Sequence, residues 1–219
     1  MGVRLYSYWR SQAAYRVRIA LALKGIDVEI ESIDLLKGDQ HNDAYRALNP
    51  SAAVPTLIDG GGPPLMESLA ILEYIDETHP SPPLLPTDPR LRAHSRAIGQ
   101  MLAADAHPFI VPRVRKHVAT EFGVDQAGVT AWVKHWLDTA SRAVEDLIAK
   151  DSRTGKFCCG DQTTVADLCL VPHFTSAMML YGGDIAAFPT CKRIFETCMS
   201  LDAFSATHPS RQPGYEPGL

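Results

Sequence analysis

Hydrophobic and polar positions in the first eighty residues follow the periodicities of strands and helices in turn. Residues 4–8 predict a short strand and residues 28–33 alternate as a strand does, whereas residues 14–24 carry apolar side chains at helical spacing and end at Gly25. The same criteria predict further elements here: a helix over 42–48, strands over 56–58 and 64–66, and a helix with Ser68 as its cap. The order βαβαββα implies a small sheet of parallel and antiparallel strands with helices packed on it.

A proline-rich segment divides the chain near residue 80. Five prolines fall within residues 79–89, a density that excludes a helix or an inner strand and indicates a linker. Beyond it no convincing strand follows, and the pattern predicts helices over 90–106, 124–150, 164–181 and 191–200. The third helix begins with a capping box formed by Thr164 and Asp167. We therefore expect an α+β protein with three parts: a βαβαββα domain over 1–82, a linker over 83–90 and an all-helical domain over 91–219.

Composition and charge narrow the possible functions. The 219 residues are 46% hydrophobic and 21% charged, which is typical of a globular protein and not of a disordered one. A net charge of 21 − 25 = −4 argues against a dedicated nucleic-acid binder. The longest uncharged stretch, residues 168–183, is shorter than the roughly 20 residues of a membrane-spanning helix. With no signal-peptide pattern at the N-terminus, we expect a cytoplasmic protein without membrane partners.

The five cysteines all lie in the last third of the chain. None of them forms a Cys-x-x-Cys pair, so the sequence offers neither a zinc knuckle nor a thioredoxin-type redox pair, and we expect no metal site. We expect reduced thiols, several of them buried.

Candidate chemistry begins in the loop between the first strand and the first helix. Ser11 stands near the helix start, where a hydroxyl can donate to a bound thiolate and lower the thiol pKa from about 8.5 towards neutrality. Arg10 can supply cationic charge there or bind a substrate carboxylate. Arg16 and Arg18, further along the helix, are expected to be solvated at their guanidinium groups, with packed stems.

Two dipeptides later in this domain also suit a peptide-like ligand. A cis bond between Val54 and Pro55 would turn the backbone N–H and C=O of Val54 outward, although an ordinary trans proline also fits the pattern. Glu67 and Ser68 open a helix whose free N–H groups favour a carboxylate, while Glu67 could receive an ammonium group. A plain helix cap is the alternative interpretation of this second pair.

Several motifs together resemble the signature of the zeta-class glutathione transferases, which include maleylacetoacetate and maleylpyruvate isomerases. The first is Ser7-Tyr8-Trp9-Arg10-Ser11 followed by Tyr15-Arg16-Val17-Arg18-Ile19-Ala20-Leu21. The resemblance covers nearly the whole chain and continues through Ala47–Pro50, Val54–Leu57, Glu67–Tyr74, Leu84–Pro86, Gly160-Asp161, Ala166–Pro172 and His208–Pro213. It implies a thioredoxin-like domain followed by an α-helical domain, a homodimer, glutathione as cofactor and a cis Val54-Pro55 bond.

The resemblance also assigns roles at the glutathione site. Ser11 becomes the thiol-activating hydroxyl with Gln12 beside it, the Val54 backbone at cis Pro55 pairs with the cysteinyl part, and Glu67 and Ser68 hold the γ-glutamyl end.

Three further residues match positions of the bacterial maleylpyruvate type. His41 corresponds to a histidine that reaches the glycine carboxylate of glutathione, and His107 to a histidine at the cofactor. Arg113 corresponds to an arginine that joins Arg10 in binding substrate. For His41 and Arg113, an ordinary surface role is the alternative.

The chain departs from the family pattern at two places. Gln12 and Ala13 replace the usual Ser-Cys after Ser11, and Leu180 stands where an arginine commonly holds a substrate carboxylate. The activity implied is cis–trans isomerisation of maleylacetoacetate or maleylpyruvate in aromatic catabolism, in which a thiolate adds to the double bond and leaves after rotation. Two alternatives remain open: a glutathione transferase or dehalogenase acting on α-haloacids, and a non-catalytic glutathione-fold binding module.

Overall fold

The computed structural model describes residues 2–217, which form two compact units. One unit comprises residues 2–84 together with residues 201–217, and the other comprises residues 85–200. The sequence predicts that everything from residue 91 onward belongs to the helical domain. The segment after residue 200 differs from that expectation because its side chains pack in the first unit.

The first unit contains a four-stranded sheet with the order β2-β1-β3-β4. β1 is parallel to β2 and antiparallel to β3, and β3 is antiparallel to β4. Its elements follow the chain as β1 (Val3–Ser7), α1 (Gln12–Leu23), β2 (Val28–Ser32), η1 (Asp39–His41), α2 (Asp43–Leu48), β3 (Thr56–Asp59), β4 (Leu65–Met66) and α3 (Ser68–Thr78). The predicted βαβαββα order is thereby confirmed.

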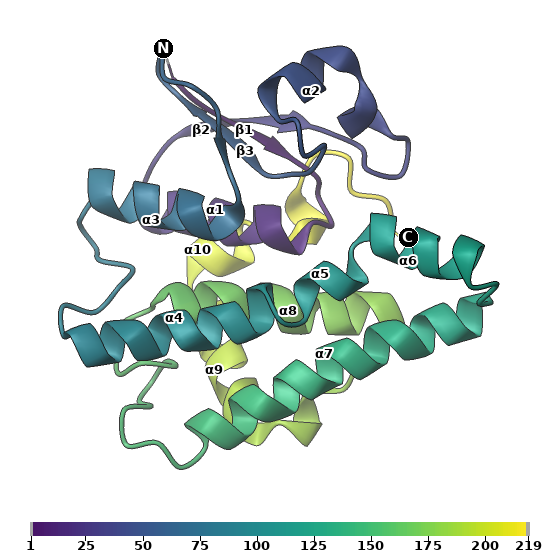
Figure 1. Ribbon diagram of the computed structural model, residues 1–219. Helices are drawn as coiled ribbons and strands as arrows, with labels where there is room; N and C mark the ends of the chain where they lie inside the picture. Colours follow the sequence, from purple (N-terminus) through teal and green to yellow (C-terminus); the bar gives the residue numbers. More distant parts are fainter. Residues whose placement is uncertain (1, 218–219) are drawn as a thin grey trace. The chain divides into compact units, whose positions relative to one another are not determined.

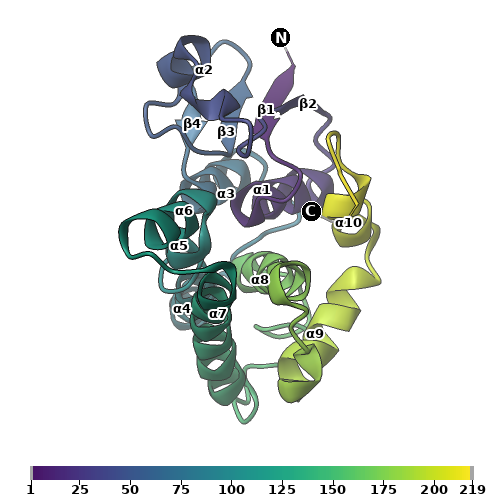
Figure 2. The ribbon, with the colours of Figure 1, turned by 90° about the vertical axis from the view of Figure 1, so that its right-hand side faces the viewer.

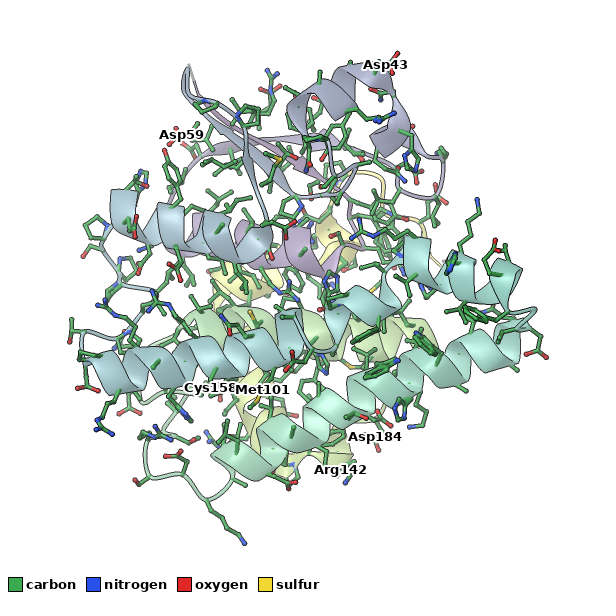
Figure 3. The ribbon with its side chains drawn as sticks, in the orientation of Figure 1. Asp43, Asp59, Met101, Arg142, Cys158 and Asp184 are labelled. Atoms are coloured by element: carbon green, nitrogen blue, oxygen red, sulfur yellow. The ribbon has the colours of Figure 1, made fainter. Side chains whose placement is uncertain are left out.

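Helices α1 and α3 lie side by side on one face of this sheet, and α2 lies on the other (Figure 1). The core between them is apolar because Leu5 and Leu57 on the strands and Ile71, Leu72 and Ile75 on α3 are at most 1% exposed. Tyr74 on α3 also donates a 2.8 Å hydrogen bond to Asp59 at the end of β3, labelled in Figure 3. These contacts fix α3, and with it the N-terminus of α3, against the sheet.

The segment after residue 200 packs against α1 (Figure 2). It contains α10 (Asp202–Ser205) and the short η3 (Pro209–Arg211). The Tyr15 hydroxyl donates to the Phe204 carbonyl at 2.9 Å, and the rings of Trp9 and Tyr215 meet edge-on at 5.1 Å. Tyr15 on α1 and Trp9 in the loop before it are therefore covered by chain that lies about 200 positions away.

The second unit is helical, as predicted, and α8 is its central helix. Its elements are α4 (Pro89–Ala103), α5 (His107–Ile110), α6 (Pro112–Glu121), α7 (Gln126–Ile148), α8 (Val165–Tyr181), η2 (Ile185–Ala187) and α9 (Pro189–Met199). Every residue of α8 from Val165 to Ala177 is buried, and α4, α7 and α9 all contact it. The capping box at its start is confirmed, since the Asp167 carboxylate accepts from the Thr164 N–H at 2.8 Å.

All five cysteines belong to the second unit and are free and buried, as expected. Burial raises the thiol pKa of Cys158, Cys159, Cys191 and Cys198, for Cys159 to about 11. Within residues 2–217, no helix is long and apolar enough to cross a membrane.

Candidate functional site

Three chain segments meet at one edge of the sheet in the first unit. The register pairs Tyr6 on β1 with Thr56 on β3, and Thr56 with Met66 on β4. The residues just beyond these positions are the β1–α1 loop, the Val54-Pro55 pair and the Glu67-Ser68 pair. The sheet therefore brings together the three features that the sequence suggested for a peptide-like ligand.

Ser11 is the N-cap of α1, and its bonding leaves the hydroxyl hydrogen for a ligand. Its Oγ accepts the backbone N–H of Ala14 at 3.2 Å, and its carbonyl accepts the N–H of Tyr15 at 2.9 Å. Because the hydroxyl oxygen is used as an acceptor, the O–H remains able to donate. The N-terminus of α1 adds its positive dipole end at the same place, which favours a thiolate over a thiol.

Arg10 precedes Ser11 and is partly buried. Burial removes water from its guanidinium and so lowers its pKa. Its Cζ lies 5.9 Å from the centre of the Trp9 ring, and its buried Nε has no hydrogen-bond partner among the described residues. A guanidinium in this state can gain from an anionic ligand, because an unpaired buried donor is costly.

The Val54-Pro55 peptide bond is cis, as the resemblance implied. Both residues are buried, and the segment before them is held by side chains of α2 and its C-terminus. The Tyr45 hydroxyl and the Asn49 side-chain amide both donate to the Ala53 carbonyl, the latter at 2.9 Å. These bonds fix the loop that presents the Val54 backbone.

The start of α3 differs from the expected cap. Glu67, not Ser68, is the N-cap residue, and its side chain makes no capping bond. Glu67 has φ 66° and ψ 115°, a backbone conformation that costs of order 1–3 kcal/mol for a residue with a side chain. Ser68 is instead the first helical residue, so its side chain does not satisfy the N–H groups of the first turn. The N–H groups of that turn favour an anionic ligand, whereas the exposed Glu67 carboxylate favours a cationic one.

Arg16 and Arg18 are buried, which contradicts the expected solvated guanidinium groups. Arg16 is 1% exposed and Arg18 is 2% exposed. Arg18 donates to the Ser7 hydroxyl at 2.9 Å and to the carbonyls of Trp9 and Thr207, and its pKa falls to about 9 because burial removes its water. The residues that cover α1 include the segment after residue 200, which a helical pattern in residues 14–24 does not reveal.

Arg16 connects the two helix N-termini of the site. Its Nη1 donates to Ser68 Oγ at 3.1 Å, and its Nη2 donates to Gln12 Oε1 at 2.7 Å. Gln12 is 3% exposed, and its Nε2 has no hydrogen-bond partner among residues 2–217. Sequence reasoning missed this role of Arg16, although the spacing of four between Gln12 and Arg16 in a helix was a usable signal.

Three further candidate residues lie in other parts of the chain. His41 ends η1 in the first unit and is exposed, with its Nε2 3.2 Å from the side-chain nitrogen of Gln40. His107 is the first residue of α5, and Arg113 is exposed on α6, both in the second unit. Their roles at cofactor and substrate stay predictions.

Leu180 belongs to an apolar cluster of the second unit. It packs, with Trp132, Trp136 and Tyr181, against a buried core cluster formed by Ile110, Val133, Leu137 and Ala177. The side chain at this position is therefore part of the packing of α8 against its neighbours.

Comparison with known proteins assigns the chain to a family. The family model of the glutathione S-transferase N-terminal domain matches residues 5–83, and that of the C-terminal domain matches residues 107–207. Maleylacetoacetate isomerase of Rattus norvegicus is 41% identical, with 95% of this chain and 93% of the relative covered. Maleylpyruvate isomerase of a Ralstonia species is 37% identical, with 96% and 99% covered. The chain belongs to the maleylacetoacetate and maleylpyruvate isomerase family of zeta-class glutathione transferases.

Solved structures of this family have the same fold. The maleylacetoacetate isomerase of Methylobacterium extorquens AM1, solved with bound malonate and glutathione, is 45% identical with a TM-score of 0.95, covering 97% of this chain and 99% of that chain. A holo structure of a zeta-class bacterial maleylpyruvate isomerase is 37% identical with a TM-score of 0.94, covering 97% and 100%. The first unit is thus the thioredoxin-like domain of a glutathione transferase fold, and the second is its helical domain.

Glutathione, the cofactor of this zeta-class family, suits the donors and acceptors at the sheet edge. Its γ-glutamyl end carries an ammonium and a carboxylate, which match the exposed Glu67 and the N-terminus of α3 with Ser68. The unpartnered Nε2 of Gln12 is a buried donor that a ligand acceptor would satisfy. The residues present therefore fit the cofactor.

Proposed function

We propose that this protein is a glutathione-dependent cis–trans isomerase that acts on maleylacetoacetate or maleylpyruvate in the breakdown of aromatic compounds. We further propose that it works as a homodimer in the cytoplasm. The observation that carries the proposal is the bonding of Ser11, whose oxygen accepts the Ala14 N–H and whose hydrogen is therefore left for a thiolate. The relatives that share the fold over nearly the whole chain are isomerases of these two substrates.

The chain's own residues have separable tasks in this reaction. Bound glutathione supplies the thiolate nucleophile that adds reversibly to the activated double bond and allows it to rotate. Ser11 stabilises the anionic sulfur by donating its hydroxyl hydrogen, and the start of α1 adds its dipole. Arg10 holds a partly desolvated guanidinium against the negative charge of the keto-acid substrate, and donors of this kind contribute roughly 3–4 kcal/mol in other enzymes.

The remaining candidates complete the proposed site. The Val54 backbone beside cis Pro55 pairs with the cysteinyl part of glutathione, and Gln12, Glu67 and Ser68 hold its γ-glutamyl end. His41 and His107 contact the cofactor, and Arg113 assists Arg10 with the substrate carboxylates. A dicarboxylate ligand in a relative is consistent with this class of substrate, since malonate is bound in the Methylobacterium enzyme.

The test is the ultraviolet absorbance of maleylpyruvate and of maleylacetoacetate mixed with the purified protein, with and without glutathione. We expect rapid loss of a cis substrate only when glutathione is present, with the free thiol concentration unchanged at the end. Arg10→Lys should retain glutathione binding but isomerise more slowly, because Lys lacks the planar fork that pairs with a carboxylate. Thiol consumption with a haloacid but not with either cis acid would overturn the proposal in favour of a conjugating transferase.

A further inference from the structure

A buried guanidinium lies between the two helix N-termini of the glutathione site. Arg16 is 1% exposed and donates to Ser68 Oγ at the start of α3 and to Gln12 Oε1 at the start of α1. Both acceptors belong to first residues of helices, where backbone N–H groups have no partner within the helix. The Arg16 guanidinium therefore contacts the N-terminal residues of both α1 and α3, and both of these helix ends favour an anion.

The direction of the hydrogen bonds at Ser68 follows from the chemistry of arginine. A guanidinium has donors and no acceptor, so the Ser68 oxygen must be the acceptor of the 3.1 Å bond. The Ser68 hydroxyl hydrogen must then be donated to a group other than Arg16. A hydroxyl whose oxygen accepts from a cation is also polarised into a stronger donor.

The same reasoning fixes the amide orientation of Gln12. Its oxygen must face Arg16, because a nitrogen there would oppose a donor to a donor at 2.7 Å. The amide nitrogen therefore points away from Arg16, and it is buried without a partner among the described residues. Arg16 thus directs two donors, the Ser68 hydroxyl hydrogen and the Gln12 amide nitrogen, away from its own guanidinium.

We propose that Arg16 is a positioning residue for the carboxylate of the γ-glutamyl end of glutathione. It holds Ser68 as an acceptor, so that the Ser68 hydroxyl hydrogen is donated to that carboxylate, and it places a buried positive charge behind the N-terminus of α3. This inference rests on the proposed use of glutathione. It adds Arg16 to the site as a residue that acts on the ligand through Ser68 and Gln12. A carboxylate is the required ligand chemistry because every available donor at this end favours an anion.

The experiment compares glutathione with an analogue that lacks only this carboxylate, 4-aminobutyryl-cysteinylglycine. Isothermal titration calorimetry gives the dissociation constants of both ligands for the wild-type protein, Arg16→Lys, Ser68→Ala and the double variant. We expect the wild-type protein to prefer glutathione by about tenfold or more, as the loss of a charge-assisted hydrogen bond implies. In Arg16→Lys this preference should fall to about threefold or less while affinity for the analogue changes by less than about twofold, because lysine cannot bridge both partners.

The double variant tests whether Arg16 acts through Ser68. In the Ser68→Ala background, Arg16→Lys should lower the remaining preference for glutathione by less than about twofold, because the bond between the two residues is already absent. Arg18→Lys is the matched control, since Arg18 is equally buried on the same helix but bonds to Ser7, Trp9 and Thr207. It should keep the wild-type preference.

Three results would overturn the inference: an unchanged preference in Arg16→Lys, an equal loss of affinity for both ligands in a folded variant, or no preference in the wild-type protein. If Arg16→Lys does not fold, Arg16→Gln replaces it, since a neutral amide removes the buried charge while Ser68 and Gln12 stay unchanged, and it should reduce the preference by about threefold or more. A wild-type protein that binds neither ligand would instead refute the proposed function, so the two failures are distinguishable.

Discussion

Replacing Ser11 with alanine removes two interactions whose sizes can be worked out separately. The first is the cap of α1, in which Ser11 Oγ accepts the Ala14 N–H, and its loss should cost about 1 kcal/mol of unfolding free energy. The second is the proposed hydrogen bond to the bound thiolate, and a bond to a charged group contributes about 1.5–3 kcal/mol. Since one pKa unit corresponds to about 1.4 kcal/mol, the pKa of the bound thiol should rise by about 1 to 2 units.

Two measurements read these effects independently. The ultraviolet absorbance of the thiolate, followed against pH in the glutathione complex, gives the thiol pKa, and urea unfolding gives the stability. Because the pKa rises, the isomerase rate of Ser11→Ala at pH 6.5 should fall by about 10- to 100-fold and recover as the pH is raised.

A cap elsewhere in the chain provides the matched control. Asp125 is the N-cap of α7 and accepts the Gly128 N–H at 2.8 Å, so Asp125→Ala should also lose about 1 kcal/mol but leave the thiol pKa unchanged. Ser11→Thr should keep both the cap and the low thiol pKa. If Ser11→Ala binds glutathione with the wild-type thiol pKa, the assignment of Ser11 as thiol activator is wrong.

Three further predictions concern stability and reactivity. At Glu145, burial alone would raise the carboxyl pKa, but hydrogen bonds from the backbone N–H groups of Cys191 and Thr190 at the start of α9 outweigh it and lower that pKa. Glu145→Gln should therefore lose about 1 kcal/mol near pH 7 in urea unfolding, and its difference from wild type should shrink as the pH falls below about 4.5; a pH-independent difference would contradict this reasoning. Tyr15→Phe removes a buried hydrogen bond to the Phe204 carbonyl and should lower the free energy of unfolding by about 1–2 kcal/mol. A variant that unfolds in urea with wild-type stability would contradict this prediction. The five buried cysteines should resist alkylation at pH 7.5 until urea unfolds the protein, and a thiol that reacts rapidly in the native state would disprove their burial.

Local patterns were sufficient to predict most of the first unit. Strand alternation, helical spacing and a glycine stop each act over a few residues, and the βαβαββα order followed from them. The capping box at Thr164 was equally local and was found in place.

Two short helices of the second unit were missed for a local reason. Helices α5 and α6 both begin with proline in their first two positions, at Pro108 and Pro112. A proline there costs little, because the missing N–H belongs to the first turn, where it has no partner within the helix. In these positions proline marks the start of a helix and does not break one, which is why the two helices were missed.

Long-range packing explains the errors at the candidate site. The surroundings of Arg16 and Arg18 depend on α3 and on the segment after residue 200, which the sequence of α1 does not specify. The backbone of Glu67 similarly depends on how β4 enters α3, so Ser68 was placed one position too early in the helix start. The residue types at the site were predictable from their chemistry and the family resemblance, whereas the buried bonds that orient them were not.

The return of the chain to its first unit has a consequence for protein synthesis. Phe204 is fully buried and accepts the hydrogen bond of Tyr15, so the first unit gains its full set of packing partners after residues 85–200 have been translated. At about 5–20 residues per second, the ribosome needs about 6 to 23 s for those 116 residues. During that interval the Tyr15 side of α1 lacks its native cover. A nascent chain stalled before residue 201 should therefore hold a thioredoxin-like unit that is open to chaperones and proteases.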